Sequence, residues 1–417
     1  MRSRRGYLLA VLFLLVALNS MDRLAVGLVL QSIKSDLHLS DAQLGLLTGM
    51  AFALFYSVMG IPIARWADRG NRIAIISLAT FLWAVALALS GLARSFQQLL
   101  LIRVGVAVGE AGVVPPAHSL IPDYFARAER PRAVSVFMLG GAFGVLLGYF
   151  VAGWLNQFYG WRETFVLIGL PGVVLAAVTW FTLEEPRRGS TRAVASVPAG
   201  RAVRELWHNR TYRHLTLSFA LICFFGSGVL QWQPTFFLRT YGLDTGELGT
   251  WLALLHGVGG MLGSYLGGAL ASRFAAGDER RQLALAAVTY SCFAALAASI
   301  YLTPSRNLAF ALTGASAVGA ALITAPVFAT IQTLVPERMR AFSIALIYLC
   351  ANLVGLGLGP LVVGFLSDAL RPLYGESSLR YALLAMCPGY VWAAWHLWRS
   401  SRYVMNDMGR LHAGVYS

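Results

Sequence analysis

The chain has 417 residues, of which 57% are hydrophobic and 12% charged, and its formal net charge at pH 7 is +14. Its mean hydropathy of +0.64 excludes a soluble globular domain, because too few polar residues remain to cover the surface of a protein this large. The positive charge does not indicate a nucleic-acid partner, since the basic residues lie mainly between long apolar runs. We therefore expect an all-α polytopic membrane protein.

Twelve apolar runs are each long enough to cross a bilayer as a helix. They cover approximately residues 6–31, 42–64, 73–93, 97–120, 133–155, 163–183, 212–238, 248–271, 282–302, 307–331, 341–366 and 380–399. Most of the 33 lysines and arginines lie on the same side as the N-terminus, in the termini and alternate connecting segments. The positive-inside rule then predicts that both termini are cytoplasmic.

The first apolar run follows Arg2, Arg4 and Arg5, as a signal peptide would, but it is too long and lacks a small-residue cleavage site. We expect it to remain as a helix. The four cysteines are scattered through apolar runs without Cys-x-x-Cys spacing, so the sequence predicts neither a disulfide nor a metal site. No cofactor is expected.

An acid and a base, Asp22 and Arg23, stand side by side inside this first run. A charge at the centre of a membrane helix costs roughly 2.5–3.5 kcal/mol, so such residues indicate a functional site. The alternative is that both lie near the helix end and extend to the lipid headgroups. The apolar pattern continues to Leu30, before the next charge at Lys34, which favours a buried position.

A short basic loop follows the second apolar run, and in it Asp68 can accept hydrogen bonds from backbone N–H groups at a helix N-terminus. We expect Arg69 and Arg72 to face the cytoplasm. This Asp-Arg-x-x-Arg turn resembles the signature loop of the major facilitator superfamily, although Ala64 and Asn71 stand where glycines are usual. The resemblance implies twelve transmembrane helices in two pseudo-symmetric six-helix bundles, and a cytoplasmic gate at Asp68, Arg69 and Arg72. An ordinary positive-inside loop is the alternative.

The fourth run carries Arg103 and Glu110, seven residues apart and therefore on one helix face, about 10 Å apart along the axis. Counting residues from each membrane side places Asp22 and Arg23 at a similar depth, so we expect the four side chains to converge, with Arg23 as the partner of Asp22. No other acid lies inside the predicted spans, away from their ends. Asp22 and Glu110 are thus the candidate proton carriers, each switched by a mobile arginine; a static ion-pair lock is the alternative.

A polar, arginine-rich stretch follows Glu185 and predicts a cytoplasmic linker, 186–211, between two six-helix halves, 1–185 and 212–399, with a cytoplasmic tail at 400–417. Internal similarity supports the halves: three glycines recur at an offset of 211. They are Gly144, Gly148 and Gly153 in the first half and Gly355, Gly359 and Gly364 in the second. Such a duplication predicts a substrate site between the halves near the bilayer midplane.

The second half has no clear intramembrane acid, so coupling chemistry is predicted in the first half. Four further residues are weaker candidates for the cavity wall: Trp232, His256, Tyr348 and Asn352. A single His or an aromatic residue on an apolar helix is more often a packing residue than part of a site.

Taken together, Met21-Asp22-Arg23, Val108-Gly109-Glu110-Ala111 and the Asp68 to Arg72 loop are similar to the Spinster subfamily. That resemblance implies a lipid transporter: animal members move sphingosine-1-phosphate or lysophospholipids, and bacterial members are proton-linked models. It assigns coupling or headgroup recognition to Asp22, Arg23, Arg103 and Glu110. An arginine can pair with a phosphate while apolar walls hold a chain, which fits an amphiphile.

We therefore expect a monomeric, proton-linked secondary transporter of a bacterial inner membrane, which moves a lipid-like or amphiphilic anion by alternating access and uses the proton gradient rather than a cofactor. A major facilitator carrier of small organic anions or drugs is the first alternative, and a receptor or scaffold without transport is the second. An enzyme is not expected, because the sequence has no phosphate-binding glycine loop, metal-spaced His and Cys set, or nucleophile elbow.

Overall fold

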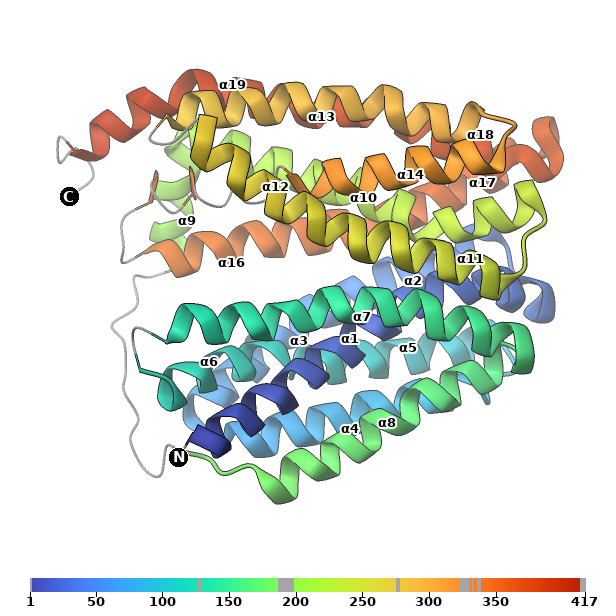
Figure 1. Ribbon diagram of the computed structural model, residues 1–417, viewed down its shortest axis with the longest axis horizontal. Helices are drawn as coiled ribbons and strands as arrows, with labels where there is room; N and C mark the ends of the chain where they lie inside the picture. The colour runs from blue at the N-terminus through green and yellow to red at the C-terminus, as the bar shows by residue number, and fades with distance from the viewer. Residues whose placement is uncertain are drawn as a thin grey trace. The chain divides into compact units, whose positions relative to one another are not determined.

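The computed structural model describes residues 2–126, 129–186, 199–274, 278–322, 330–331, 334–335 and 339–412. This part of the chain is almost entirely helical and contains no strand (Figure 1). Its helices form two compact units: unit 1 is Met1–Ala193 with Leu230–Gly257, and unit 2 is Val194–Val229 with Val258–Ser417. The predicted halves follow the order of the chain, whereas these units follow packing, so the segment 230–257 lies in unit 1.

Unit 1 is built around the first eight helices. They are α1 (Arg2–Leu37), α2 (Asp41–Thr48), α3 (Met50–Arg69), α4 (Arg72–Ser90), α5 (Phe96–Ala111), α6 (Val114–Tyr124), α7 (Arg130–Tyr159) and α8 (Trp161–Thr182). The later part of α10 (Arg210–Tyr241), α11 (Thr245–Leu252) and most of the π-helix η1 (Ala253–Val258) complete it. Helix α1 packs on α7, α4 packs on both α5 and α8, and α11 packs on α7.

Unit 2 contains the early part of α10 and the remaining elements. They are α9 (Ala199–His208), α12 (Gly259–Phe274), α13 (Glu279–Leu302), α14 (Arg306–Leu322), α16 (Arg340–Cys350), the π-helix η3 (Ala351–Leu358), α17 (Gly359–Tyr374), the short 3-10 helix η4 (Gly375–Ser377), α18 (Ser378–Met386) and α19 (Pro388–His412). Helix α13 packs on α19, and α12 packs on α14.

A stripe of glycines on α7 lets α1 approach closely. An added Cβ at Gly140 would lie 2.5 Å from the carbonyl oxygen of Phe13, and one at Gly144 would lie 2.2 Å from that of Ala17. These are closer than any real side chain allows, so only glycine fits. The stripe fixes the depth and rotation of α1, the helix that carries Asp22 and Arg23.

The glycine repeat seen in the sequence has the same packing role in unit 2. An added Cβ at Gly355 would lie 2.4 Å from the Cβ of Cys223, and one at Gly359 would lie 2.4 Å from the carbonyl oxygen of Phe224. Both contacts are to α10, so η3 and α17 lie on α10 as α7 lies on α1. The repeated glycines therefore mark equivalent helix contacts in the two units.

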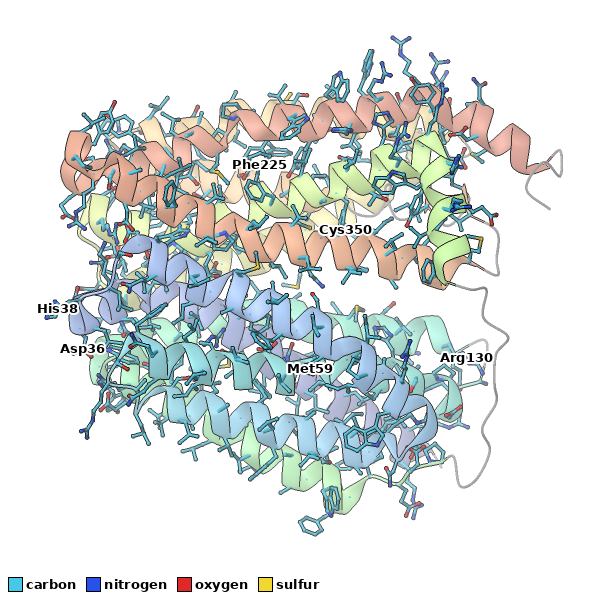
Figure 2. All side chains as sticks on the ribbon, turned by 180° about the vertical axis from the view of Figure 1, so that it is seen from behind. Asp36, His38, Met59, Arg130, Phe225 and Cys350 are labelled. Carbon is cyan, nitrogen blue, oxygen red and sulfur yellow. The ribbon has the colours of Figure 1, made fainter. Side chains whose placement is uncertain are left out.

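Unit 1 has a buried apolar cluster between the first turns of α1, α4 and α7, with α6 and the end of α8. Its members are Leu8, Val11, Leu12, Leu15, Val16, Ile73, Ile76, Val113, Ala117, Leu120, Ile121, Ala133, Phe137 and Leu175. Many large apolar side chains also lie on the outside, among them Phe181, Leu101 and Tyr265, and Figure 2 shows such side chains along the outer helices. An apolar exterior of this extent suits contact with lipid tails.

Nine helical stretches within the described ranges are long and apolar enough to cross a membrane, judged by length and composition. The last of them, Phe342–Gly409, covers 68 residues and several elements. The prediction of many membrane-crossing helices is thus confirmed, and the count of twelve stays a prediction.

Candidate functional site: a buried cluster of two acids and two arginines

The four charged residues expected to converge do so in unit 1. Helix α1 supplies Asp22 and Arg23, and α5 supplies Arg103 and Glu110. The side chains of Asp22 and Glu110 are fully buried and that of Arg103 is 3% exposed, whereas that of Arg23 is 30% exposed. We call these four residues the charge cluster.

The ion pairs of the charge cluster run between the helices. Arg23 donates from Nε to Oε2 of Glu110 at 2.7 Å, and Arg103 donates from Nη1 to Oδ1 of Asp22 at 3.3 Å. The expectation that Arg23 is the partner of Asp22 is therefore wrong. Adjacent residues on a helix point about 100° apart, so neighbours in sequence do not face each other and each pairs with α5 instead.

Aromatic residues of α3 and α4 surround the charge cluster, and sequence reasoning missed them. Trp83 donates its indole N–H to Oδ2 of Asp22 at 2.8 Å. The guanidinium carbon of Arg23 lies 5.0 Å from the ring centre of Phe52 and 4.7 Å from that of Tyr56. Cation–π contacts of this kind hold an arginine side-on while its edge remains free for an anion.

Two atoms of the charge cluster are buried without a hydrogen bond within the described residues: Oε1 of Glu110 and Nε of Arg103. The Glu110 carboxyl also interacts electrostatically with Asp22 and Arg103. Two acids and two arginines balance in charge only while both acids are ionised. A buried carboxylate that loses its arginine partner is strongly destabilised.

Gly109, the residue before Glu110, allows α5 to pack closely on α4. An added Cβ at Gly109 would lie 2.6 Å from the backbone nitrogen and 2.7 Å from the Cβ of Trp83. The close approach of α5 to α4 at this point brings Glu110 and the indole of Trp83 to the same depth as Asp22.

At the end of α3, the predicted gate residues are described only in part. The side chains of Asp68 and Arg69 lie outside the described residues. Arg72, the first residue of α4, is fully buried, whereas the sequence predicts that it faces the cytoplasm. It pairs with Asp123 at 2.6 Å and with Glu185, which also accepts a hydrogen bond from its backbone N–H at 2.7 Å.

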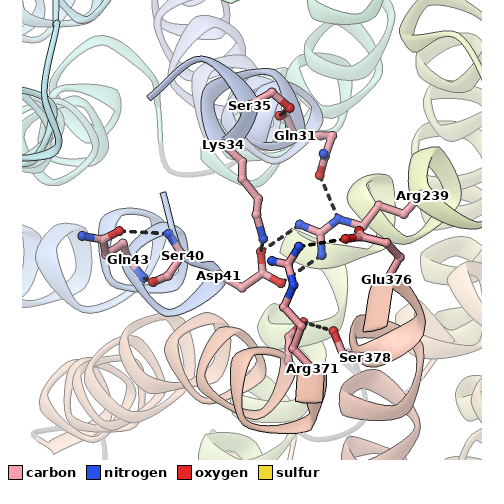
Figure 3. Close-up of polar contacts among 11 residues, drawn as sticks. Gln31, Lys34, Ser35, Ser40, Asp41, Gln43, Arg239, Arg371, Glu376 and Ser378 are labelled. Atoms are coloured by element: carbon pink, nitrogen blue, oxygen red, sulfur yellow. Dashed lines mark hydrogen bonds and ion pairs between the residues drawn. The ribbon is translucent and has the colours of Figure 1, made fainter. Parts of the chain in front are cut away.

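A second buried polar cluster, also missed, joins α1, α2 and α10 within unit 1 (Figure 3). Asp41 is 1% exposed and accepts from Lys34 at 2.5 Å and from Arg239 at 2.9 and 2.8 Å. Arg239 also donates to the side chain of Gln31 at 2.8 Å. Ser40 caps α2 in a capping box.

The weaker candidates belong to other helices than the charge cluster. His256 lies in η1 of unit 1 and is hydrogen-bonded to the side chain of Gln233 at 2.8 Å, while Trp232 is fully buried. Tyr348 and Asn352 belong to unit 2, where the ring of Tyr348 makes an edge contact with that of Phe219.

The helices are apolar, and their glycine contacts repeat in the two units. They also enclose a polar cluster in which two acids balance two arginines. These are features of a membrane transport protein. The sequence matches the family model of the Major Facilitator Superfamily over residues 12–360. The chain belongs to the Major Facilitator Superfamily; it is an integral membrane transporter and not an enzyme.

Relatives and solved structures give the same assignment and confirm the resemblance to Spinster proteins. A crystal structure of a bacterial homologue of the human lysosomal transporter Spinster, inward-facing and unoccupied, has a TM-score of 0.84 and 31% identity, covering 98% of this chain and 99% of that chain. An MFS-type efflux pump of Mycolicibacterium smegmatis is 33% identical over 385 residues, covering 90% of this chain and 87% of that protein. The sphingosine-1-phosphate transporter SPNS2 of Danio rerio is 27% identical over 407 residues, covering 89% of this chain and 79% of that protein.

Proposed function

We propose that this protein is a proton-linked transporter of an anionic amphiphile, such as a lysophospholipid or a sphingolipid-type molecule. It would work by alternating access in a bacterial inner membrane, as a monomer with both termini in the cytoplasm. The observation that carries the proposal is a pair of ion pairs inside an apolar bundle, in each of which an acid of one helix meets an arginine of the other. Its likeness to a sphingosine-1-phosphate transporter supports the substrate class.

Arg23 is the group proposed to meet the substrate headgroup. It is the most exposed member of the charge cluster, with 30% of its side chain accessible, and its guanidinium lies against the rings of Phe52 and Tyr56. Guanidinium groups bind phosphate and carboxylate through two parallel hydrogen bonds. The aromatic rings beside it provide apolar surface for the first carbons of a chain.

Proton and anion binding are linked through the Arg23–Glu110 pair. An anion that takes the guanidinium of Arg23 leaves the fully buried carboxyl of Glu110 without its 2.7 Å partner. An unpaired buried carboxylate is unfavourable, so Glu110 then takes up a proton. Conversely, protonation of Glu110 releases Arg23 for the anion. The two ligands therefore favour each other's binding, which predicts symport rather than exchange.

Uptake into proteoliposomes tests the proposal. The purified protein is reconstituted, and uptake of a radiolabelled lysophospholipid is measured with and without an inward-directed proton gradient. We expect the gradient to accelerate uptake by the native protein and to have no effect on Glu110→Gln, which still exchanges substrate across the membrane. Glu376→Gln is the matched control, because it removes a carboxyl from an exposed ion pair with Arg371.

Two outcomes contradict the proposal. If Glu110→Gln keeps the full response to the gradient, Glu110 is not the proton carrier. If the native protein exchanges protons for substrate, with transport slowed by an inward gradient, the linkage through Arg23 has the wrong sign.

A carrier of small organic anions or drugs is the second candidate, favoured by the likeness to an MFS-type efflux pump. The same vesicles distinguish the two when loaded with a fluorescent drug or offered a labelled small carboxylic acid. If those compounds are transported and the lysophospholipid is not, the substrate is a small anion or drug rather than an amphiphile. The role of Glu110 is then tested in the same way with that compound.

A further inference from the structure

Four arginines gather where the C-terminal half of α19 meets the start of α10 in unit 2, and none of them has an ion pair among the described residues. They are Arg210, Arg213, Arg399 and Arg402. Figure 2 shows nitrogen-tipped side chains projecting along this part of α19. Elsewhere in the same unit, Arg371 pairs with Glu376 at 2.8 Å, so an unpaired group of arginines is not the rule there.

The carboxylate that joins α19 to the start of α10 is already hydrogen-bonded. Asp407 is 4% exposed, and its Oδ2 accepts from the backbone N–H and the hydroxyl of Thr211 at 2.9 and 2.7 Å. The imidazoles of His214 and His396 are hydrogen-bonded to each other at 2.9 Å. These contacts fasten α19 to α10 and leave the arginines without a partner of opposite charge.

Two of the arginines contact the ring of Tyr403. The guanidinium carbons of Arg399 and Arg210 lie 5.3 and 5.5 Å from its ring centre, and Arg399 donates to its hydroxyl at 2.7 Å. The Nε of Arg399 is buried and makes no hydrogen bond within the described part of the chain. Like charges held this close repel each other, so the arrangement favours an anion that binds both.

An apolar stripe leads up to these arginines along one face of α19. Trp392, Trp395 and Trp398 are 55%, 46% and 41% exposed, and the guanidinium of Arg402 lies 4.6 Å from the ring centre of Trp398. Tryptophans are typical of the level at which lipid tails meet headgroups. Helix α9, just before α10, adds an exposed Trp207 at this end of unit 2.

We propose that this arginine-aromatic surface, comprising Arg210, Arg399, Arg402, Trp395, Trp398 and Tyr403, binds an anionic phospholipid. The phosphate lies between the guanidinium groups, and the acyl chains run down the tryptophan stripe. The charge complementarity selects the anion, and the stripe selects a lipid over a soluble phosphate, which has no use for an apolar face. The surface lies outside the charge cluster, so the inference does not depend on the transported substrate.

Native mass spectrometry of the purified full-length protein tests this lipid site. The protein is exposed in detergent to equal amounts of phosphatidylglycerol and phosphatidylcholine, and the lipids that remain bound are counted. We expect the native protein to retain phosphatidylglycerol preferentially. In the double variant Arg399→Gln with Arg402→Gln, the ratio of bound phosphatidylglycerol to bound phosphatidylcholine should fall by about five-fold or more. Arg280→Gln is the matched control, since Arg280 is an exposed arginine at the start of α13 in the same unit.

The double lysine variant, Arg399→Lys with Arg402→Lys, keeps the charge and separates binding from folding: partial recovery of the preference supports a headgroup site. Equal retention of the two lipids by the native protein, or an unchanged preference in the double Gln variant, overturns the proposal. So does full displacement of phosphatidylglycerol by millimolar glycerol phosphate or by an acidic peptide, either of which would identify a soluble ligand.

Discussion

Replacing Gly109 by alanine should destabilise the protein, whereas the same change at Gly105, one turn earlier on α5, should not. A Cβ at position 109 would lie 2.6 Å from the backbone nitrogen of Trp83 and 2.8 Å from the carbonyl oxygen of Ala79. Carbon atoms pack at about 3.5–4.0 Å, so α5 and α4 must separate by about 1 Å. Overpacking of this kind costs about 1–3 kcal/mol.

At Gly105, the nearest atom to an added Cβ is the Cβ of Ala86 at 3.6 Å, which is an ordinary contact. Alanine is favoured over glycine in a helix interior by roughly 0.5–1 kcal/mol, so Gly105→Ala is expected to be neutral or stabilising. The two variants should therefore differ by about 1.5–4 kcal/mol in stability.

Thermal unfolding in detergent, followed by tryptophan fluorescence, measures this difference. We expect the unfolding temperature of Gly109→Ala to fall below that of the native protein and that of Gly105→Ala to equal or exceed it. Gly109→Ala should also reduce transport, because a separation of about 1 Å breaks the geometry of the Trp83 to Asp22 hydrogen bond. Equal unfolding temperatures for the two variants would refute the close contact of α5 with α4.

Two further substitutions test the buried polar groups. Trp83→Phe keeps the aromatic bulk but removes the donor to Asp22, and a buried acceptor left unpaired costs about 1–3 kcal/mol, so we expect a lower unfolding temperature. Asp41→Asn leaves Lys34 and Arg239 facing a neutral group in a nearly dry site, and we expect a loss of about 3 kcal/mol, measured in the same assay.

The exposed pair of Arg371 and Glu376 calibrates both measurements. Glu376→Gln should change stability by at most about 1 kcal/mol, because water screens an exposed ion pair. A loss of that small size in Trp83→Phe or Asp41→Asn would contradict the burial on which the two predictions depend.

That the four charged side chains meet was predictable from residue counting along the helices. Each helical residue rises 1.5 Å, so the positions of Asp22 and Glu110 within their runs place both near mid-depth, and the seven-residue spacing puts Arg103 on the face of Glu110. The class of fold followed from composition and from the glycine repeat.

Which side chains pair was not predictable, because pairing depends on how the helices are rotated about their axes. The rotation of α1 is set by glycines on α7 that meet Phe13 and Ala17, more than a hundred residues away in sequence. Trp83 was missed for a related reason. In a chain this apolar, a tryptophan that donates to a carboxylate looks the same as one that faces lipid.

Burial of Arg72 was likewise hidden from the sequence. A basic loop predicts exposure to the cytoplasm, and nothing local identifies Glu185, which lies 113 residues further on, as the carboxylate that draws the side chain inward. The position of the segment 230–257 also depends on contacts that are distant in sequence. It follows the predicted linker but packs with unit 1.

The crossed arrangement of the charge cluster has a consequence for the way the protein is made. Helix α1 leaves the ribosome long before α5, and a lone charge in the bilayer costs roughly 2.5–3.5 kcal/mol. Within its apolar run, however, each helix carries one acid and one arginine, Asp22 with Arg23 on α1 and Arg103 with Glu110 on α5. Each can therefore enter the membrane electrically neutral. The ion pairs of Arg23 with Glu110 and of Arg103 with Asp22 then form only when the two helices come together.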